Sequence, residues 1–204
     1  MARWSALPTW WLREEGLGIF TGGSQAGRSI AALKVLMAIA LLANFNSRKA
    51  RNSLSDLETL TGLSRPMVIR GVADLEDKGL LLVDRSGHVN EYELAVPGDD
   101  RNWGKMPYET LRRHLAEISN RGAITLGALK IYLLLVSWRP NQSLSIAIGH
   151  GKIRDETGIQ ARHVRPALDV LLNHTLIRLS INEGRIPGEA QGRHNVYTLL
   201  GLTL

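Results

Sequence analysis

Arginine side chains lie beside two apolar stripes in this chain, at a spacing that suits contact with a polyanion. The first stripe consists of Val68, Val72 and Leu75, and the second of Val164, Leu168 and Leu171. Both follow the i, i+4, i+7 spacing of one helix face, and Arg65 and Arg70 fall away from that face. Because an arginine can bond guanine at two points, the pattern favours duplex DNA as the partner. The alternative is an ordinary solvated helix face.

The net charge of the chain also favours a polyanionic partner. Its 204 residues carry 25 Lys and Arg against 19 Asp and Glu, which gives a formal net charge of +6 and a pI near 10.0. The excess is about +1 through Val96 and about +5 from Pro97 onward. We therefore expect the second half to make the stronger electrostatic contact.

The sequence repeats itself at an offset of 96 residues. The matching segments are Ala32-Leu33-Lys34 with Ala128-Leu129-Lys130, Thr61-Gly62-Leu63 with Thr157-Gly158-Ile159, and Leu80-Leu81 with Leu176-Ile177. Matches that keep one register over roughly fifty positions indicate duplication of a structural unit. We therefore expect two similar domains, each with a small core of its own.

Each copy is expected to begin with a helix that is apolar nearly all round, as suits the centre of a small domain. Ser29 and Thr125 are the predicted N-caps of these helices, which span residues 30–44 and 126–139. A loop of polar and turn residues follows each one, at 46–52 and 140–143.

Two shorter helices should follow in each copy. The second helix is capped at Ser53 or Ser55 and ends at Gly62, and its counterpart covers residues 151–158. The third helix starts at Ser64 or Arg65 and runs to residue 78, and its counterpart covers about 160–173. Pro166 falls inside that counterpart, which predicts a later helix start or a kink.

A β-hairpin is expected after each third helix. The predicted strands are 80–83 and 89–95 in the first copy, and 176–181 and 195–200 in the second. The connection in the second hairpin is nine residues longer and contains Arg185 and Arg193. The fold class is therefore mainly α with small β-hairpins, an α+β chain of two repeated domains.

Four regions are expected along the chain. They are an N-terminal segment with three Trp at 1–28, a first domain at 29–96, a linker with a connecting helix at 97–122, and a second domain at 123–204. The N-terminal Trp residues are expected to pack on the first domain or to mediate dimerisation.

Residues 60–81, which read LTGLSRPMVIRGVADLEDKGLL, carry a family resemblance. This segment is similar to the winged helix-turn-helix proteins of bacteria, and the tandem arrangement resembles the replication initiators of plasmids and phages. The resemblance implies that the third helix of each domain lies in the major groove, while the hairpin, or wing, reaches the backbone or the minor groove.

The resemblance also implies a set of DNA-contacting residues. On the third helices these are Ser64, Arg65, Met67 and Arg70, and Gln160, Arg162, His163 and Arg165. From the wings and the loop before the second helix we add Arg85, His88, Arg48, Lys49, Arg51, Arg185 and Arg193. The preferred function is a DNA-binding protein with some sequence preference, either a replication initiator or a transcription regulator of a mobile element. The alternative is a structural adaptor, because tandem winged helices also bind protein partners.

Other classes of function have weaker support. The chain has no Cys and six scattered His, which excludes disulfides and predicts no metal site, and no catalytic residues or cofactor are expected. The sequence from Gly22 to Ser29 resembles a phosphate-binding loop, but it has Arg28 at the position where such loops require Lys. The longest apolar run has 14 residues and contains Lys34, so we expect a buried helix in a cytoplasmic protein, with neither a membrane contact nor a small-molecule substrate.

Overall fold

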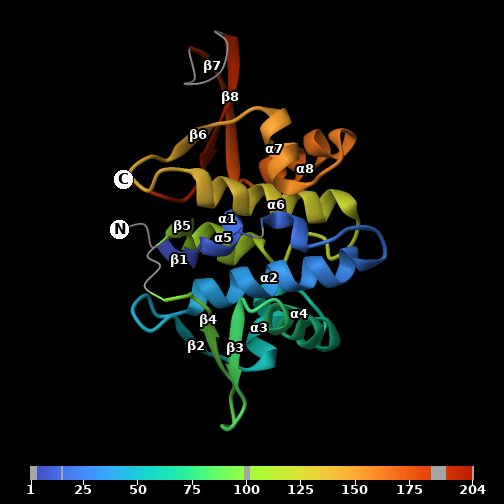
Figure 1. Cartoon of the computed structure of the whole chain (residues 1–204), viewed down its shortest axis with the longest axis vertical. Helices are drawn as coiled ribbons and strands as arrows, with labels where there is room; N and C mark the ends of the chain where they lie inside the picture. Colours follow the sequence, from blue (N-terminus) through green and yellow to red (C-terminus); the bar gives the residue numbers. More distant parts are fainter. Residues whose placement is uncertain (1–3, 15, 99–101, 185–191, 204) are drawn as a thin grey trace.

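The computed structural model describes residues 4–14, 16–98, 102–184 and 192–203 and has a mixed α+β fold with small sheets (Figure 1). Two units of helices and strands lie on either side of a thin central layer. The two long hairpins point away from this layer in opposite directions. The N and C labels both lie at the left edge of the molecule in Figure 1.

The first unit covers residues 26–94. Its elements are α2 (Ala26–Leu42), β2 (Lys49–Arg51), α3 (Leu54–Thr61), α4 (Arg65–Asp77), β3 (Leu81–Asp84) and β4 (Glu91–Leu94). The strands form an antiparallel sheet in the order β2-β4-β3. The buried Tyr92 at its centre is flanked by Ala50 and Val83.

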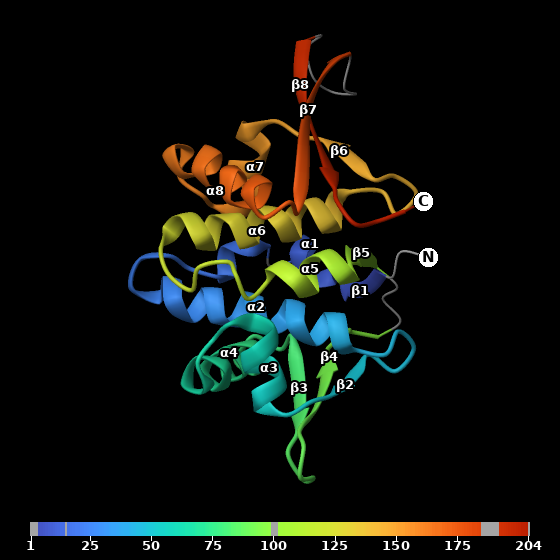
Figure 2. The same ribbon diagram turned by 180° about the vertical axis from the view of Figure 1, so that it is seen from behind.

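The second unit covers residues 123–199 and has the same order of elements (Figure 2). These are α6 (Ala123–Trp138), β6 (Ser145–Ala147), α7 (His150–Thr157), α8 (Ala161–Asn173), β7 (Ile177–Gly184) and β8 (Gly192–Leu199). Its sheet has the order β6-β8-β7. The buried Tyr197 is flanked by Ile146 and Leu179, in the positions that Ala50 and Val83 hold around Tyr92.

A close helix crossing holds each unit together, and a glycine permits it in both. A Cβ on Gly71 of α4 would come within 2.8 Å of the Ala31 carbonyl oxygen of α2. In the second unit the small residues are exchanged, since Gly127 of α6 faces Ala167 of α8. The offset of 96 therefore matches Ala31 with Gly127 and Gly71 with Ala167, and each crossing keeps one glycine.

A buried lysine explains the strongest matches in the repeat. Lys34 donates from Nζ to the Thr61 carbonyl at 2.9 Å, and also to the Ile118 carbonyl and Asn120 Oδ1. Lys130 donates to the Thr157 carbonyl, again at 2.9 Å. Each ammonium thus lies at the C-terminal end of the second helix, where the helix dipole favours a positive charge. Burial lowers the pKa of both lysines to about 8.

The central layer is built from two strand and helix segments. Strand β1 (Trp4–Pro8) pairs antiparallel with β5 (Trp103–Pro107), and Ala6 lies opposite Lys105 at the middle. Helix α1 (Trp10–Glu14) follows β1, and α5 (Tyr108–His114) follows β5. Two 3₁₀ turns, η1 (Leu17–Ile19) and η2 (Gly23–Gln25), lead from α1 to α2.

The two segments of the central layer match each other at an offset of 99 residues. Trp4, Pro8 and Leu12 correspond to Trp103, Pro107 and Leu111. Ala6 corresponds to Lys105, the residue that it faces, so the β1–β5 pair is approximately twofold symmetric. From the sequence, the first segment is expected in an N-terminal region outside the repeat and the second in a linker with a connecting helix.

Several local predictions are confirmed and others are wrong. Ser53 caps α3 in a capping box with Asp56, and α4 and α8 begin at the residues expected. The caps predicted at Ser29 and Thr125 are wrong, because both residues lie inside helices that begin three or two residues earlier, at Ala26 and Ala123. Residues 49–51 were expected to be loop but form β2, an edge strand whose three residues are too few for an alternating pattern to be recognised.

The long helices α2 and α6 form the core. Nearly all their side chains are buried, and α2 packs on α4, α6 and β1. Together with the turn before it, α2 gives one span in the described part of the chain, Gly23–Leu42, that is long and apolar enough to cross a membrane. Because 78% of it is buried inside the protein, the span is compatible with the core helix of a soluble protein.

Candidate nucleic-acid interface

The start of α4 is set by its contacts with α3. Helix α3 ends at Gly62, whose φ of 66° is in the left-handed region, and Ser64 takes the N-cap position of α4. A Cβ on Gly62 would come within 2.5 Å of the Ala116 carbonyl oxygen. The left-handed turn and the close contact with Ala116 therefore both favour glycine at this position.

The stripe predicted on α4 is buried as expected. Val68, Val72 and Leu75 face α2, whereas Arg65, Ile69 and Arg70 are exposed. Ile69 is 50% exposed. Met67, which the resemblance placed among the reading residues, is half-buried and packs against the core. The exposed face of α4 therefore mixes two arginines with an apolar side chain.

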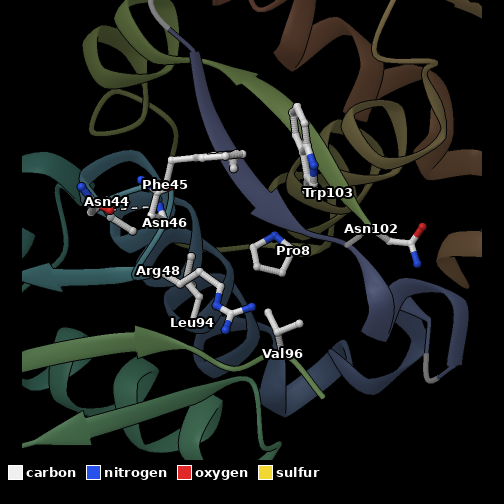
Figure 3. A pocket seen from close by; sticks show the side chains of 11 residues that line it. Pro8, Asn44, Phe45, Asn46, Arg48, Leu94, Val96, Asn102 and Trp103 are labelled. Atoms are coloured by element: carbon white, nitrogen blue, oxygen red, sulfur yellow. Dashed lines mark hydrogen bonds between the residues drawn. The ribbon is translucent and has the colours of Figure 1, made fainter. Parts of the chain in front are cut away.

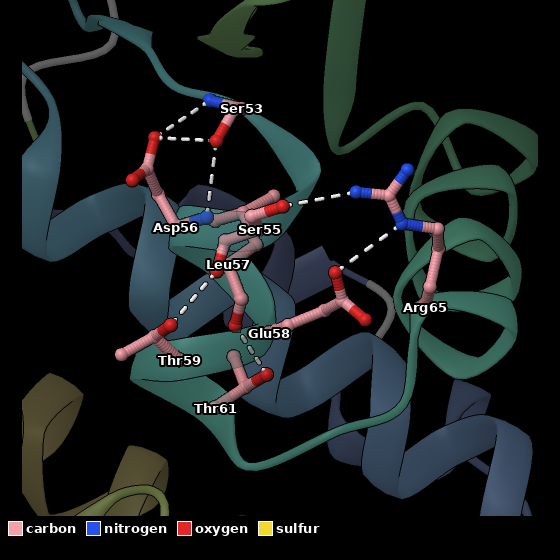
Figure 4. Close-up of polar contacts among 8 residues, drawn as sticks. All are labelled: Ser53, Ser55, Asp56, Leu57, Glu58, Thr59, Thr61 and Arg65. Carbon is pink, nitrogen blue, oxygen red and sulfur yellow. Dashed lines mark hydrogen bonds and ion pairs between the residues drawn. The ribbon is translucent and has the colours of Figure 1, made fainter.

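Acidic residues pair with three of the predicted contact residues of the first unit. Arg65 donates to Glu58 Oε2 at 3.3 Å and to Ser55 Oγ at 2.9 Å, so α3 holds it (Figure 4). Arg85 forms a two-point ion pair with Glu76, with distances of 2.8 and 2.6 Å, which raises the pKa of Arg85. Lys49 lies 2.7 Å from Glu91, and this hydrogen bond raises its pKa.

The remaining predicted basic residues of the first unit are spread over four places. Arg70 on α4, Arg51 on β2 and His88 in the β3–β4 turn are exposed. Arg48 lies elsewhere, in the loop after α2, where its side chain enters a pocket beside β1 (Figure 3). Figures 1 and 2 both place this loop on the side of the chain termini, opposite α4. The structure therefore does not bring Arg48 together with Arg65 and Arg70.

The exposed face of α8 carries arginines without acidic partners. Val164, Leu168 and Leu171 are buried against α6, and Arg162 and Arg165 are exposed. In the described part of the chain neither arginine forms an ion pair or a side-chain hydrogen bond. Gln160 is exposed at the N-cap position, and His163 is half-buried beside it.

Two more exposed arginines lie on the same unit, and sequence reasoning missed them. They are Arg154 on α7 and Arg178 on β7, and neither has an ion pair within the described ranges. At the offset of 96 these positions correspond to Glu58 and Leu82 in the first unit, and Arg165 corresponds to Ile69. A comparison of the two copies of the repeat for their differences, as well as for their identities, would have identified these two arginines.

Pro166 is the sixth residue of α8, and the helix continues through it to Asn173. The later helix start that the sequence allowed is therefore wrong. Proline has no amide hydrogen, so the Arg162 carbonyl loses its i+4 partner within the helix.

The second hairpin lies only partly within the described residues. Strands β7 and β8 pair as far as Gly184 and Gly192, further than predicted. Arg193 lies on β8 opposite Glu183, and the predicted contact residue Arg185 falls outside the described ranges.

Helices α4 and α8 lie on the same side of the molecule, away from the termini, in both views (Figures 1 and 2). Each follows a shorter helix, α3 or α7, that ends at a glycine with a φ of 66°. One side therefore presents two pairs of helices, each joined at a glycine turn, and within the described residues the second pair has more arginines without an acidic partner.

Residues that resemble a phosphate-binding loop have structural roles. Arg28 lies 2.7 Å from the buried Asp74 carboxylate and 2.9 Å from Asp77, and so ties α2 to α4. Ser29 donates to the Thr21 carbonyl at 2.8 Å. The two side chains that would contact phosphate and metal in such a loop are therefore already engaged.

Three side chains converge in a way that their spacing in the sequence did not reveal. Glu117 Oε2 lies 2.6 Å from His114 Nδ1 and 3.6 Å from His174 Nδ1, and the hydrogen bond from His114 lowers the pKa of Glu117. The three ligand atoms lie within 4.8 Å of one another, so this is the cluster among the described residues that could hold a divalent metal ion. It connects the end of α5 to the end of α8.

Comparison with models of known protein families finds no match to this chain, and neither does comparison with curated proteins.

Proposed function

We propose that this protein is a tandem winged-helix protein that binds duplex DNA, and that its second unit is the principal reader. The observation that carries this proposal is the set of exposed arginines on α7 and α8 that have no acidic partner within the described residues: Arg154, Arg162 and Arg165. An unpaired guanidinium exchanges only water and counterions when it meets a phosphate or a base.

In this proposal α8 enters the major groove with its N-terminal turns towards the bases. Arg162 and Arg165 project from those turns and would bond the O6 and N7 atoms of guanine. Arg154, at the last turn of α7, would contact a phosphate next to the groove, and Arg178 on β7 would contact the backbone from the hairpin.

The first unit would bind DNA more weakly. Arg65 must exchange its contacts with Glu58 and Ser55 for contacts with DNA, and Arg85 must leave Glu76. Arg70 is the residue of α4 that can approach DNA without breaking an ion pair described here. Two unequal readers in one chain suit an asymmetric site with two different half-sites about one helical turn, or roughly 10 base pairs, apart. Control of replication or of transcription in a mobile element is the role proposed for such a protein.

A role as structural adaptor is the second candidate, and exposed apolar side chains on the first unit favour it. Ile69 on α4 is 50% exposed and Leu82 on β3 is 58% exposed, in positions where the second unit has Arg165 and Arg178. Such side chains are typical of a surface that binds protein.

Mobility shifts with duplex DNA from a random library, measured at several salt concentrations, test the proposal. We expect enrichment of a site and a linear fall of log affinity with log salt. Arg162→Ala with Arg165→Ala should reduce affinity at least tenfold, because each base contact contributes about 1–3 kcal/mol. Arg48→Ala with Lys105→Ala removes the same charge from the side of the termini and should change affinity little. Absence of any shift at low salt would refute DNA binding and leave the adaptor role.

A further inference from the structure

A pocket of about 490 Å³ lies between strand β1 and the loop that follows α2 (Figure 3). Phe45 and Trp103 line the pocket and contact each other edge to face, with ring centroids 5.6 Å apart, and Trp103 also stacks on Trp4. Pro8 lies between Trp103 and Arg48. Among the described residues Arg48 is the one charged side chain that lines the pocket, and its Nε is buried and has no hydrogen-bond partner there. The pocket therefore combines flat apolar walls with an unsatisfied cationic donor.

One edge of the pocket is an unpaired strand. Thr9 donates its amide to the Asn102 carbonyl of the neighbouring segment, which makes residues 5, 7 and 9 the ones bonded across to β5. The amide and carbonyl of Ala6 therefore point away from β5, and Ala6 lines the pocket. Within the described ranges neither group of Ala6 has a hydrogen-bond partner.

The second unit shows what the fold places at the equivalent edge. Ala43 and Arg139 are the C-cap residues of α2 and α6, and Phe45 and Asn141 follow two residues later. Arg139 donates to the Lys105 carbonyl at 3.2 Å. Asn141 accepts from the Lys105 amide at 3.2 Å and donates to the Trp103 carbonyl at 2.9 Å.

The pocket of the first unit lacks the two side chains that bond the strand edge in the second unit. Lys105 is the counterpart of Ala6, so the second unit satisfies its own strand edge with two flat groups, a guanidinium and an amide. Ala43 and Phe45 supply neither group in the first unit. The open pocket is therefore shaped for a flat ligand that carries hydrogen-bond donors and acceptors in its plane.

We propose that this pocket binds a nucleotide. A nucleobase is a flat ring with donors and acceptors at its edge, and these would pair with the amide and carbonyl of Ala6. Phe45 and Trp103 would stack against the ring or its edge, as aromatic side chains do with unpaired bases. The Arg48 guanidinium would then bind the phosphate, which suits its planar donors.

The backbone of the pocket loop supports this role for Arg48. Its φ of 59° is a conformation that residues other than glycine rarely adopt. Hydrogen bonds hold the residue on both sides, since its amide donates to the Asn44 carbonyl at 2.8 Å and its carbonyl accepts from the Leu94 amide at 3.0 Å. The strained backbone is thus fixed in the orientation that directs the side chain into the pocket.

Two sources of nucleotide share this chemistry, a free nucleoside phosphate and a base of single-stranded DNA. Both differ from the duplex site, because the pocket lies on the side of the termini and α4 and α8 lie on the other (Figure 1). The nucleotide proposal therefore does not depend on duplex binding, and one can fail without the other.

Quenching of tryptophan fluorescence tests the proposal, because Trp103 lines the pocket. The full chain is titrated with AMP and, separately, with a ten-residue oligo-dA. Quenching by both shows that free nucleotides enter, and quenching by the oligonucleotide alone assigns the pocket to single strands. Either result supports the proposal. No quenching by either probe at millimolar concentration overturns it, as does quenching by an acidic peptide alone.

A variant that copies the second unit localises the binding. Ala43→Arg with Phe45→Asn fills the pocket with the groups found at Arg139 and Asn141. It should reduce the affinity for AMP and for oligo-dA at least tenfold. The melting temperature of this variant and its affinity for duplex DNA should stay unchanged. As a control, Ala147→Arg adds the same charge at an exposed site on β6 and should bind both probes like the wild type. Unchanged binding by the filled variant overturns the proposal. Should that variant fail to fold, Arg48→Met provides the test: it must abolish the preference for AMP over adenosine.

Discussion

The two units share one order of elements, and they differ in the charges that cover it. Glu58 holds Arg65 in the first unit, and the corresponding position in the second is Arg154. Ile69 and Leu82 are exposed apolar residues where the second unit has Arg165 and Arg178. The two units therefore have matching core residues and different surfaces, and under the proposed function the second unit would bind DNA tightly while the first provides a weaker contact.

Exchange of these surface residues should have the largest effect on duplex affinity. Arg154→Glu with Arg165→Ile gives the second unit the charges of the first, and should reduce duplex affinity by about 2 kcal/mol or more, since one base contact and one phosphate contact are lost. The slope of log affinity against log salt should fall by about 0.9 for each phosphate contact removed. Mobility shifts at four salt concentrations measure both.

The reverse exchange tests whether the surface residues of the first unit limit its affinity for duplex DNA. Glu58→Arg with Ile69→Arg should increase duplex affinity and steepen the salt dependence, because Arg65 loses its acidic partner and two cations are added. If neither exchange changes affinity, helices α4 and α8 do not lie on DNA.

The buried lysines should differ in their contribution to stability. Lys34→Met leaves three acceptors without a donor. Among the described residues, Lys130→Met leaves one acceptor without a donor, the Thr157 carbonyl. An unsatisfied buried polar group costs about 1–3 kcal/mol, so the first variant should lose roughly 3 kcal/mol or more and the second about 1–3. Urea unfolding of both variants measures this, and equal losses would contradict the difference in bonding.

The two turn glycines provide a smaller contrast. Both have a φ of 66°, and a Cβ on Gly62 would meet the Ala116 carbonyl, whereas a Cβ on Gly158 would meet no atom within 4 Å. Gly158→Ala should therefore cost only the left-handed conformation, about 1–2 kcal/mol. Gly62→Ala should cost more than this, and equal melting temperatures for the two variants would show that the contact with Ala116 is easily relieved.

The same lysines should make stability depend on pH. Their folded-state pKa of about 8 lies below the ordinary value of 10.5, so between these pH values the folded protein releases protons that the unfolded chain retains. The free energy of unfolding should therefore rise as pH increases from 8 to 10.5, relative to a Lys34→Met, Lys130→Met control. A flat or falling difference would mean that the lysines are not desolvated in the folded state.

The sequence alone determined the three helices and the hairpin of each unit and their order, but not the edge strands β2 and β6. Apolar spacing along 68–75 and 164–171, the capping box at Ser53 and the glycines at 62 and 158 are local signals, and the third helices began where those signals predicted. The offset of 96 predicted a second set of elements from the first. Position along these helices also indicated which arginines would be exposed.

Only the tertiary structure decided which charges remain unpaired and how the units meet. The partners of Arg65, Arg85 and Arg28 lie between 7 and 49 residues away, and local spacing does not predict such pairs. Strands β1 and β5 are joined across 99 residues, and their short sequences show no pattern that identifies the partner. The pocket beside Ala6 likewise arises from two substitutions, at 43 and 45, whose effect appears only when the strand edge and the loop are side by side. Long-range pairing places these groups together, and sequence periodicity reports only which face of an element is buried.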